Sequence, residues 1–216
     1  MHVTRILAVR HGETAWNRDN RIQGHTDVEL NEHGQWQARQ LAQALQDEPI
    51  AALYASDLSR ARQTAQAVAQ LRGQSVSAHP GLRERCFGRF EGHTWAELEL
   101  RWPEQALAWR QRVPDFSPPE GESLLQLRAR VVQTVTALAA RHPGEQVLLV
   151  AHGGVLDILY RAATRQDIQA ARSWQMPNAA INRLLWSSEG LCLVSWGDLN
   201  HLQTPDIRHS QDEHAA

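Results

Sequence analysis

Two apolar runs in this chain end in the same way. Residues 5–9 (RILAV) and 146–151 (QVLLVA) are short, nearly continuous and rich in Val, Ile and Leu, which is typical of strands buried on both faces. The first run stops at Arg-His-Gly (10–12) and the second at His-Gly-Gly (152–154). Charged and polar groups at the end of a core strand are costly, so the pattern indicates that both ends have a task.

The rest of the chain alternates strands with helices. Further strands are expected at residues 50–56, 75–79, 182–186 and 191–196, the last two as a hairpin. Helices are expected after the N-caps Asn31, Thr94 and Ser123, and at residues 59–71 and from 103. The repeated strand–helix units predict a three-layer α/β/α sandwich with a mostly parallel central sheet, whose ligands bind beyond the carboxyl ends of the strands.

We expect one domain over residues 1–200, followed by a flexible tail at 201–216. Residues 93–120 interrupt the strand–helix order with prolines and short helical pieces, so we interpret them as a lid-like insertion over one end of the sheet.

Three tryptophans, Trp95, Trp102 and Trp109, recur every seven residues in this insertion, with Arg112 among the arginines nearby. They fit either a lid that contacts substrate or ordinary packing of large aromatic side chains, and packing is favoured.

Composition narrows the classes of function. The net charge is −2 and no apolar run approaches a secretory signal or a membrane span, so we expect a cytoplasmic protein without nucleic-acid or membrane partners. Cys86 and Cys192 have no metal-like spacing and are expected to be free thiols. All 22 basic residues are arginine, which excludes a P-loop lysine, a Schiff-base lysine and the kinase lysine.

The two strand ends together indicate an anion site. Parallel strands place their carboxyl ends at one edge, so His11 and His152 are expected to converge there. Glycine after each histidine leaves room for oxyanions to approach the backbone, and Arg10 supplies a fork-shaped cation. One such histidine alone is more often an ordinary surface residue. A metal site is the rival interpretation, but neither HExxH nor a close His-x-His pair occurs.

Seven ordered motifs resemble the histidine phosphatase superfamily, the phosphoglycerate mutase-like proteins. They span residues 5–196 in order: VRHGETAWN, RIQG, LNEHGQWQA, SDLSRARQTA, LRERCFGRFEG, PPEGES and VAHGG. A lone RHG would be weak evidence, whereas the ordered set is specific.

The resemblance implies a role for each matching residue. His11 is the expected nucleophile and Glu84 the proton donor, while Arg10, Arg60 and a protonated His152 are expected to bind the phosphoryl group. The expected phosphate- and substrate-binding residues are Asn17, Gln23, Gly24, Gly153 and Arg85. Such an enzyme forms a phosphohistidine and needs no metal or other cofactor. Without the ordered motifs, Arg60 and Glu84 would be interpreted as ordinary charged residues on the surface.

The sequence favours the phosphatase branch over a cofactor-dependent phosphoglycerate mutase. The insertion looks short and lacks the paired arginines of the mutases, and Gly153-Gly154 replaces their Gly-Asn. The expected substrate is a small phosphorylated metabolite, and a phosphate or sulfate ion should fit the pocket. A non-catalytic phospho-ligand-binding scaffold is the alternative of another class, and a homodimer stays open.

Overall fold

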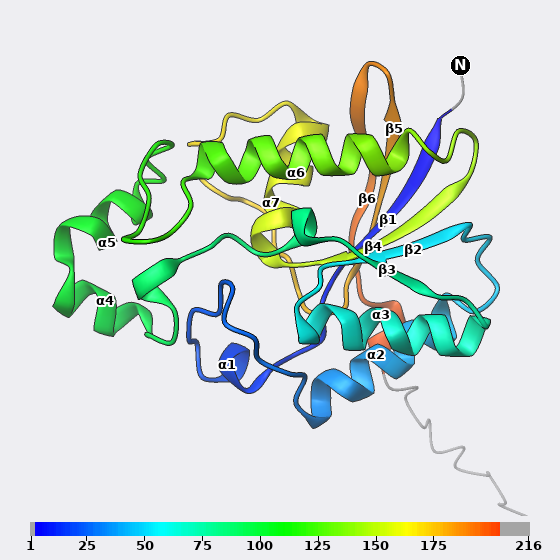
Figure 1. Ribbon diagram of the computed structural model, residues 1–216, viewed down its shortest axis with the longest axis horizontal. Coiled ribbons are helices and arrows are strands. Elements are labelled where there is room, and N and C mark those ends of the chain that lie inside the picture. Colours follow the sequence, from blue (N-terminus) through cyan, green and yellow to red (C-terminus); the bar gives the residue numbers. More distant parts are fainter. Residues whose placement is uncertain (1–2, 204–216) are drawn as a thin grey trace, which may run out of the picture.

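A mixed sheet lies between two layers of helices in the computed structural model, which describes residues 3–203 (Figure 1). The strands are β1 (Thr4–Arg10), β2 (Ala52–Ala55), β3 (Val76–Ala78), β4 (Gln146–Ala151), β5 (Ile181–Ser187) and β6 (Gly190–Asp198). Their order is β3-β2-β4-β1-β5-β6. The first four are parallel, while β5 pairs antiparallel with both β1 and β6. The predicted α/β fold with a mostly parallel sheet is therefore confirmed.

Helices cover both faces of this sheet. They are α1 (Ala15–Arg18), α2 (Glu32–Ala44), α3 (Ser59–Arg72), α4 (Trp95–Arg101), α5 (Pro103–Arg110), α6 (Leu124–Ala139) and α7 (Gly153–Thr164). Helices α2 and α3 pack on one face, and α6 and α7 on the other. Figure 1 shows α4 and α5 projecting beyond the sheet, at the end of the molecule away from the β5–β6 hairpin.

Strand β1 shows why the sheet is buried on both faces. Side chains alternate along a strand, so Ile6 and Ala8 join the core beneath α6 and α7, while Leu7 and Val9 join the core beneath α2 and α3. All four are at most 1% exposed. Because both faces are covered, the strand reads as an unbroken apolar run and its carboxyl end is held rigidly.

The predicted helix starts are confirmed. Asn31 caps α2 through its side-chain oxygen, which accepts a hydrogen bond from the Gly34 N–H at 2.8 Å. Thr94 and Ser123 form capping boxes at α4 and α6. Helix α7 was not predicted, although its apolar residues recur at helical spacing, and neither was the single turn of α1.

A small core joins the insertion to the loop before it, which supplies Phe90. Phe90, Leu98 and Ala106 are buried in it, and the tryptophans Trp95, Trp102 and Trp109 pack around them. All three tryptophans therefore supply packing area, and Trp109 also lines two cavities.

Described residues continue past the last strand. A short 3-10 helix at Asn200–Leu202 follows β6, and the rest of the predicted tail, 204–216, lies outside the described residues. Within residues 3–203, no helix is both long and apolar enough to cross a bilayer.

Candidate active site

His11 follows the carboxyl end of β1 and is 3% exposed. Its ring Nδ1 lies 2.7 Å from the carbonyl oxygen of Gly12. A carbonyl can only accept, so Nδ1 carries the proton and Nε2 presents a lone pair. Burial, followed by the charges of Arg60 and Arg10, holds the pKa of His11 well below its ordinary value. His11 is therefore a neutral imidazole with a defined nucleophilic nitrogen.

His152 follows the carboxyl end of β4 and meets His11, as the two strand ends predicted. The two ring centroids are 5.1 Å apart. Both ring nitrogens of His152 are buried and make no hydrogen bond to residues 3–203. Burial, then Arg60, His11 and Arg10, hold the pKa of His152 well below its ordinary value. These effects favour the neutral ring in the protein without substrate, and the protonated His152 expected beside a bound phosphoryl group stays a prediction.

Arg60 reaches the pocket from α3 and is completely buried. Its terminal nitrogens donate to the carbonyl oxygens of Thr26 at 2.9 Å and Gly24 at 2.7 Å, and its Nε has no partner within residues 3–203. Burial lowers the pKa of Arg60 to about 10, which leaves it charged at neutral pH. Arg10 is held in a similar way, because one terminal nitrogen donates to the Met176 carbonyl at 2.7 Å.

Glu84 comes from the loop between β3 and α4 and lies against the first turn of α7. Both of its carboxylate oxygens are 3.0 Å from the Gly154 nitrogen, which donates to them. Oε1 also accepts from the Arg85 N–H at 2.7 Å. A Cβ atom built on Gly153 would be 3.8 Å from both Arg10 Nε and Glu84 Oε2. The proposed acid and the first arginine therefore flank the same glycine.

These side chains line a cavity of about 140 Å³, which we call the phosphate pocket. Its lining residues are Arg10, His11, Asn17, Arg21, Ile22, Gln23, Gly24, Arg60, Glu84, Phe87 and Trp109. His152 is fully buried in contact with His11 and is not among the residues that line this cavity. The pocket thus combines a neutral imidazole, three guanidinium groups (Arg10, Arg21 and Arg60) and one carboxylate, which is a set suited to a phosphoryl group.

Three further predicted residues belong to this pocket in different ways. Gln23 is 8% exposed, and its Oε1 is buried without a partner in residues 3–203. Asn17 caps its own helix, since its Oδ1 accepts from the Thr14 N–H at 3.1 Å. Gly24 has a φ of +55°, and its carbonyl orients Arg60.

Arg85 lies outside the phosphate pocket. Its guanidinium donates to the carbonyl oxygens of Glu122 at 2.7 Å and Phe116 at 2.9 Å. It lines an adjacent cavity of about 290 Å³, which we call the leaving-group pocket. The residues around that cavity are Arg10, Arg85, Phe87, Trp109, Arg112, Leu124, Leu127, Gly153, Gly154, Asp157, Arg172 and Met176. The two pockets share Arg10, Phe87 and Trp109.

Sequence reasoning missed Asp157 and Arg172 in this second cavity. An acidic residue inside the apolar stretch VLDILY was the available signal for Asp157, because a buried carboxylate needs partners.

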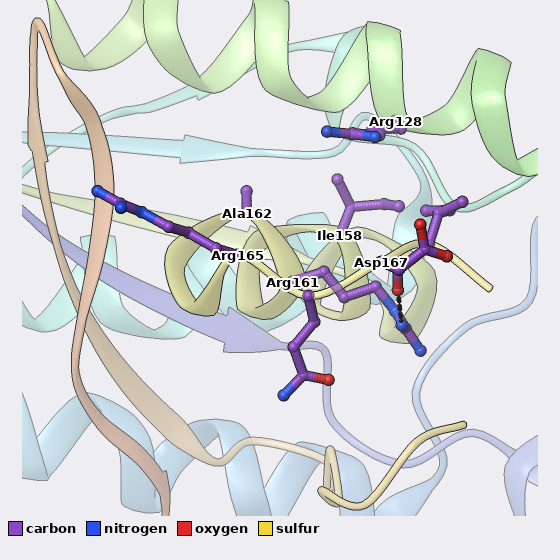
Figure 2. Close-up of a pocket in the computed structure, with 8 residues that line it drawn as sticks. Arg128, Ile158, Arg161, Ala162, Arg165 and Asp167 are labelled. Carbon is purple, nitrogen blue, oxygen red and sulfur yellow. Dashed lines mark hydrogen bonds between the residues drawn. The ribbon is translucent and has the colours of Figure 1, made fainter. Parts of the chain in front are cut away.

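A larger cavity, of about 420 Å³, lies on another side of α7 (Figure 2). Its labelled residues include Arg128 on α6 and Arg161 and Arg165 at the end of α7. Arg161 is already engaged, because it donates to the Asp167 carbonyl, as the dashed line shows, and to the Ala170 carbonyl at 2.8 Å. No histidine lines this cavity in the part of the chain described here, so it does not share the chemistry of the phosphate pocket.

The metal site considered as a rival lacks a ligand set. Among residues 3–203, no three His, Cys, Asp or Glu side chains are grouped as metal ligands would be. The cysteines Cys86 and Cys192 are free thiols, as predicted.

Known proteins match this arrangement along nearly the whole chain. The histidine phosphatase superfamily (branch 1) matches residues 6–199. Phosphoglycerate mutase-like protein 4 of Arabidopsis thaliana is 37% identical over 202 residues, which are 92% of this chain and 86% of that protein. The metal-independent phosphoserine phosphatase of the same plant is 38% identical over 205 residues, covering 94% and 84%.

A solved structure agrees with both sequence matches. Mycobacterial glucosyl-3-phosphoglycerate phosphatase superposes with a TM-score of 0.81 at 32% identity, over 91% of this chain and 99% of that one. The paired strand ends, their converging histidines and these matches lead to one conclusion: the chain belongs to branch 1 of the histidine phosphatase superfamily.

Proposed function

We propose that this protein hydrolyses small phosphomonoesters through a phosphohistidine on His11, with Glu84 as general acid and base. The observation that carries the proposal is the hydrogen bond from His11 Nδ1 to the Gly12 carbonyl, which leaves Nε2 as the free nucleophile. Phosphatase activity of this type agrees with the phosphatase-named relatives of the chain.

The first step transfers the phosphoryl group to the protein. Nε2 of His11 attacks phosphorus in line, a P–N bond forms, and the bond to the ester oxygen breaks. Arg10 and Arg60 neutralise the non-bridging oxygens, so the nucleophile does not meet an uncompensated dianion. Neutral His152 can donate one ring N–H, and the arriving dianion favours its protonation.

Glu84 handles the protons of both steps. In the first step, the protonated carboxyl transfers its proton to the departing alkoxide, which leaves as an alcohol. In the second step, the resulting carboxylate takes a proton from water, which attacks the phosphohistidine and releases phosphate. The N–H groups of Gly154 and Arg85 hold this carboxylate in place between the steps.

Activity with a chromogenic substrate tests the proposal. Purified protein should release p-nitrophenol from p-nitrophenyl phosphate in the presence of EDTA, and His11→Ala should lose at least about a thousandfold in rate. His33→Ala is the matched control, because His33 is an exposed histidine on α2 outside both pockets. Binding of phosphate without turnover would favour the scaffold instead.

Acid quench during turnover identifies the intermediate. A labelled substrate should leave an acid-labile phosphoryl group on His11, detected by peptide mapping. Label on a serine or on His152 would refute the assignment.

A mutase is the second candidate, since a relative at 37% identity is named mutase-like. Faster transfer between positions of phosphoglycerate than hydrolysis would establish it. A cytoplasmic location and a homodimer stay predictions from the sequence, to be checked by fractionation and by light scattering.

A further inference from the structure

Asp157 is a buried carboxylate that gathers three arginines behind the leaving-group pocket. It lies in α7 and is 2% exposed. Its Oδ2 accepts from Arg112 at 2.7 Å and from Arg161 at 3.1 Å, and its Oδ1 accepts from Arg172 at 3.1 Å. Burial alone would raise the pKa of Asp157, but the charges of Arg172, Arg112 and Arg161 outweigh it and lower the pKa. The cluster therefore holds one negative charge and three positive ones.

Of these arginines, Arg161 has all three guanidinium nitrogens engaged by protein acceptors. Its Nε is bonded to Asp157, and its two terminal nitrogens donate to the carbonyl oxygens of Asp167 and Ala170. Arg161 also lines the other cavity of α7 and not the leaving-group pocket. Of the three partners of Asp157, Arg112 and Arg172 are the two that line the leaving-group pocket.

Arg112 is placed by an unusual backbone conformation. It follows α5 with a φ of +54°, the position at which glycine usually ends a helix. Its N–H donates to the Trp109 carbonyl at 2.9 Å, and the Val113 N–H donates to the Ala108 carbonyl at 3.1 Å. A bulky residue in this conformation costs about 1 kcal/mol or more. The chain nevertheless keeps an arginine here, and its guanidinium bonds Asp157 and the Ile168 carbonyl.

Arg172 is only partly engaged. Its Nε bonds Asp157, while its two terminal nitrogens make no hydrogen bond to residues 3–203, and its side chain is 41% exposed. Asp157 therefore fixes one edge of the guanidinium and leaves the other edge free to donate two parallel hydrogen bonds. That edge has the spacing of a carboxylate.

We propose that Arg112 and Arg172, both held by Asp157, form a subsite for a carboxylate on the leaving group, so that the preferred substrate is a short phosphorylated acid. The inference rests on the proposed hydrolysis at His11. Asp157 acts here as a positioning residue, since it touches the arginines and not the substrate.

The walls of the leaving-group pocket agree with this substrate class. Four arginines line it, and Asp157, already bonded to two of them, is the one acidic residue among the described residues around it. Leu124, Leu127 and Met176 supply apolar contacts suited to a short carbon chain. A neutral leaving group would leave the free donors of Arg172 without an anionic partner, which makes it the poorer fit.

Two matched pairs of substrates test the subsite directly. 3-Phosphoglycerate and glycerol 3-phosphate differ only in a carboxylate against a hydroxymethyl group, as do O-phosphoserine and phosphoethanolamine in a carboxylate against hydrogen. The native protein should show about a tenfold to hundredfold higher kcat/KM for the acid of each pair, carried mainly by KM. Equal values for both members would overturn the proposal. A preference for 1,3-propanediol bisphosphate over both acids would also overturn it, in favour of a second phosphate.

Arg172→Gln tests the assignment to this residue. It should lower kcat/KM for 3-phosphoglycerate by about tenfold or more, and that for glycerol 3-phosphate by less than threefold. Arg172→Lys should restore part of the acid preference, because it returns the charge without the fork. An equal loss on both substrates would indicate a structural role and refute the subsite.

Arg165→Gln is the control. Arg165 is an exposed arginine at the end of α7, and it lines the larger cavity on the other side of that helix (Figure 2). This variant should leave kcat/KM unchanged for both 3-phosphoglycerate and glycerol 3-phosphate. If the native protein does not hydrolyse p-nitrophenyl phosphate, the proposed function itself is refuted. That outcome differs from a failure of the carboxylate subsite, which leaves this hydrolysis intact.

Discussion

The phosphate pocket and the leaving-group pocket are neighbours built on different principles. In the first, His11 and His152 follow two buried parallel strands, so their positions are set by the backbone ladder of the sheet. In the second, Arg112 and Arg172 come from the end of a short helix and from a loop, and a single buried carboxylate holds them. The two histidines are therefore positioned by regular structure, whereas the two arginines are positioned by side-chain hydrogen bonds.

Glu84→Gln in the phosphate pocket should cause the largest loss of rate among these variants. Glutamine keeps the shape but cannot deliver a proton, so hydrolysis of alkyl phosphates should fall by about 10²- to 10⁴-fold. p-Nitrophenyl phosphate has a leaving group that needs little protonation and should lose less than tenfold. Steady-state rates on both substrates provide the measurement, and equal losses would remove Glu84 from the role of acid.

Arg60→Gln should lower kcat for every phosphomonoester by about 10²- to 10³-fold, because it removes a buried cation aimed at the phosphoryl oxygens. It should also shift the pH profile. Arg60 helps to hold the pKa of His11 below its ordinary value, so the acidic limb of kcat/KM should lie below pH 6.5 in the native protein and move to higher pH in the variant. The ionisation of the substrate cancels in this comparison, and an unmoved limb would contradict the argument.

Gly154→Ala should reproduce part of the Glu84 effect without touching Glu84. A Cβ atom there would lie 2.2 Å from Glu84 Oε1, so the carboxylate must move away from the start of α7. Hydrolysis of alkyl phosphates should fall by up to about a hundredfold, with a smaller loss on p-nitrophenyl phosphate. Gly153→Ala is the matched variant, because its Cβ would meet no atom closer than 3.8 Å, and the loss should be smaller.

Thr94→Ala should have the smallest effect and separate the insertion from the phosphate pocket. The change removes the capping box at the start of α4 and should cost about 1 kcal/mol of unfolding free energy. For a chain of this length, that loss should lower Tm by about 2–4 °C. The rate on p-nitrophenyl phosphate should stay within twofold; a larger change would mean that the insertion also sets the geometry of the phosphate pocket.

The same contrast explains what could be predicted from the sequence. The strand ends at Arg10, His11 and His152 were visible because an unbroken apolar run reports a buried strand, and topology then brings parallel strand ends together. Arg60 and Glu84 were found only through the resemblance. Their place depends on how a helix and a loop fold back over the sheet edge, which no local pattern encodes.

For a related reason, the sequence could not predict the protonation state of His152 or the cluster of arginines around Asp157. The pKa of His152 is lowered by total burial beside two guanidinium groups, and burial is a property of the assembled core. Arg172 meets Asp157 across 15 residues of helix and loop, a distance in sequence at which spacing carries no information. Arg112 was noted only as one arginine near the tryptophans of the insertion.

The place of β1 in the sheet has a consequence for biosynthesis. This strand is made before both of its partners, which are β4, at residues 146–151, and β5, at residues 181–187. Closing such long loops makes pairing slow and dependent on distant segments. His11 therefore follows a strand that has neither partner until residues 146–151 have been made. A nascent chain that stops before residue 181 leaves one edge of β1 unpaired and apolar.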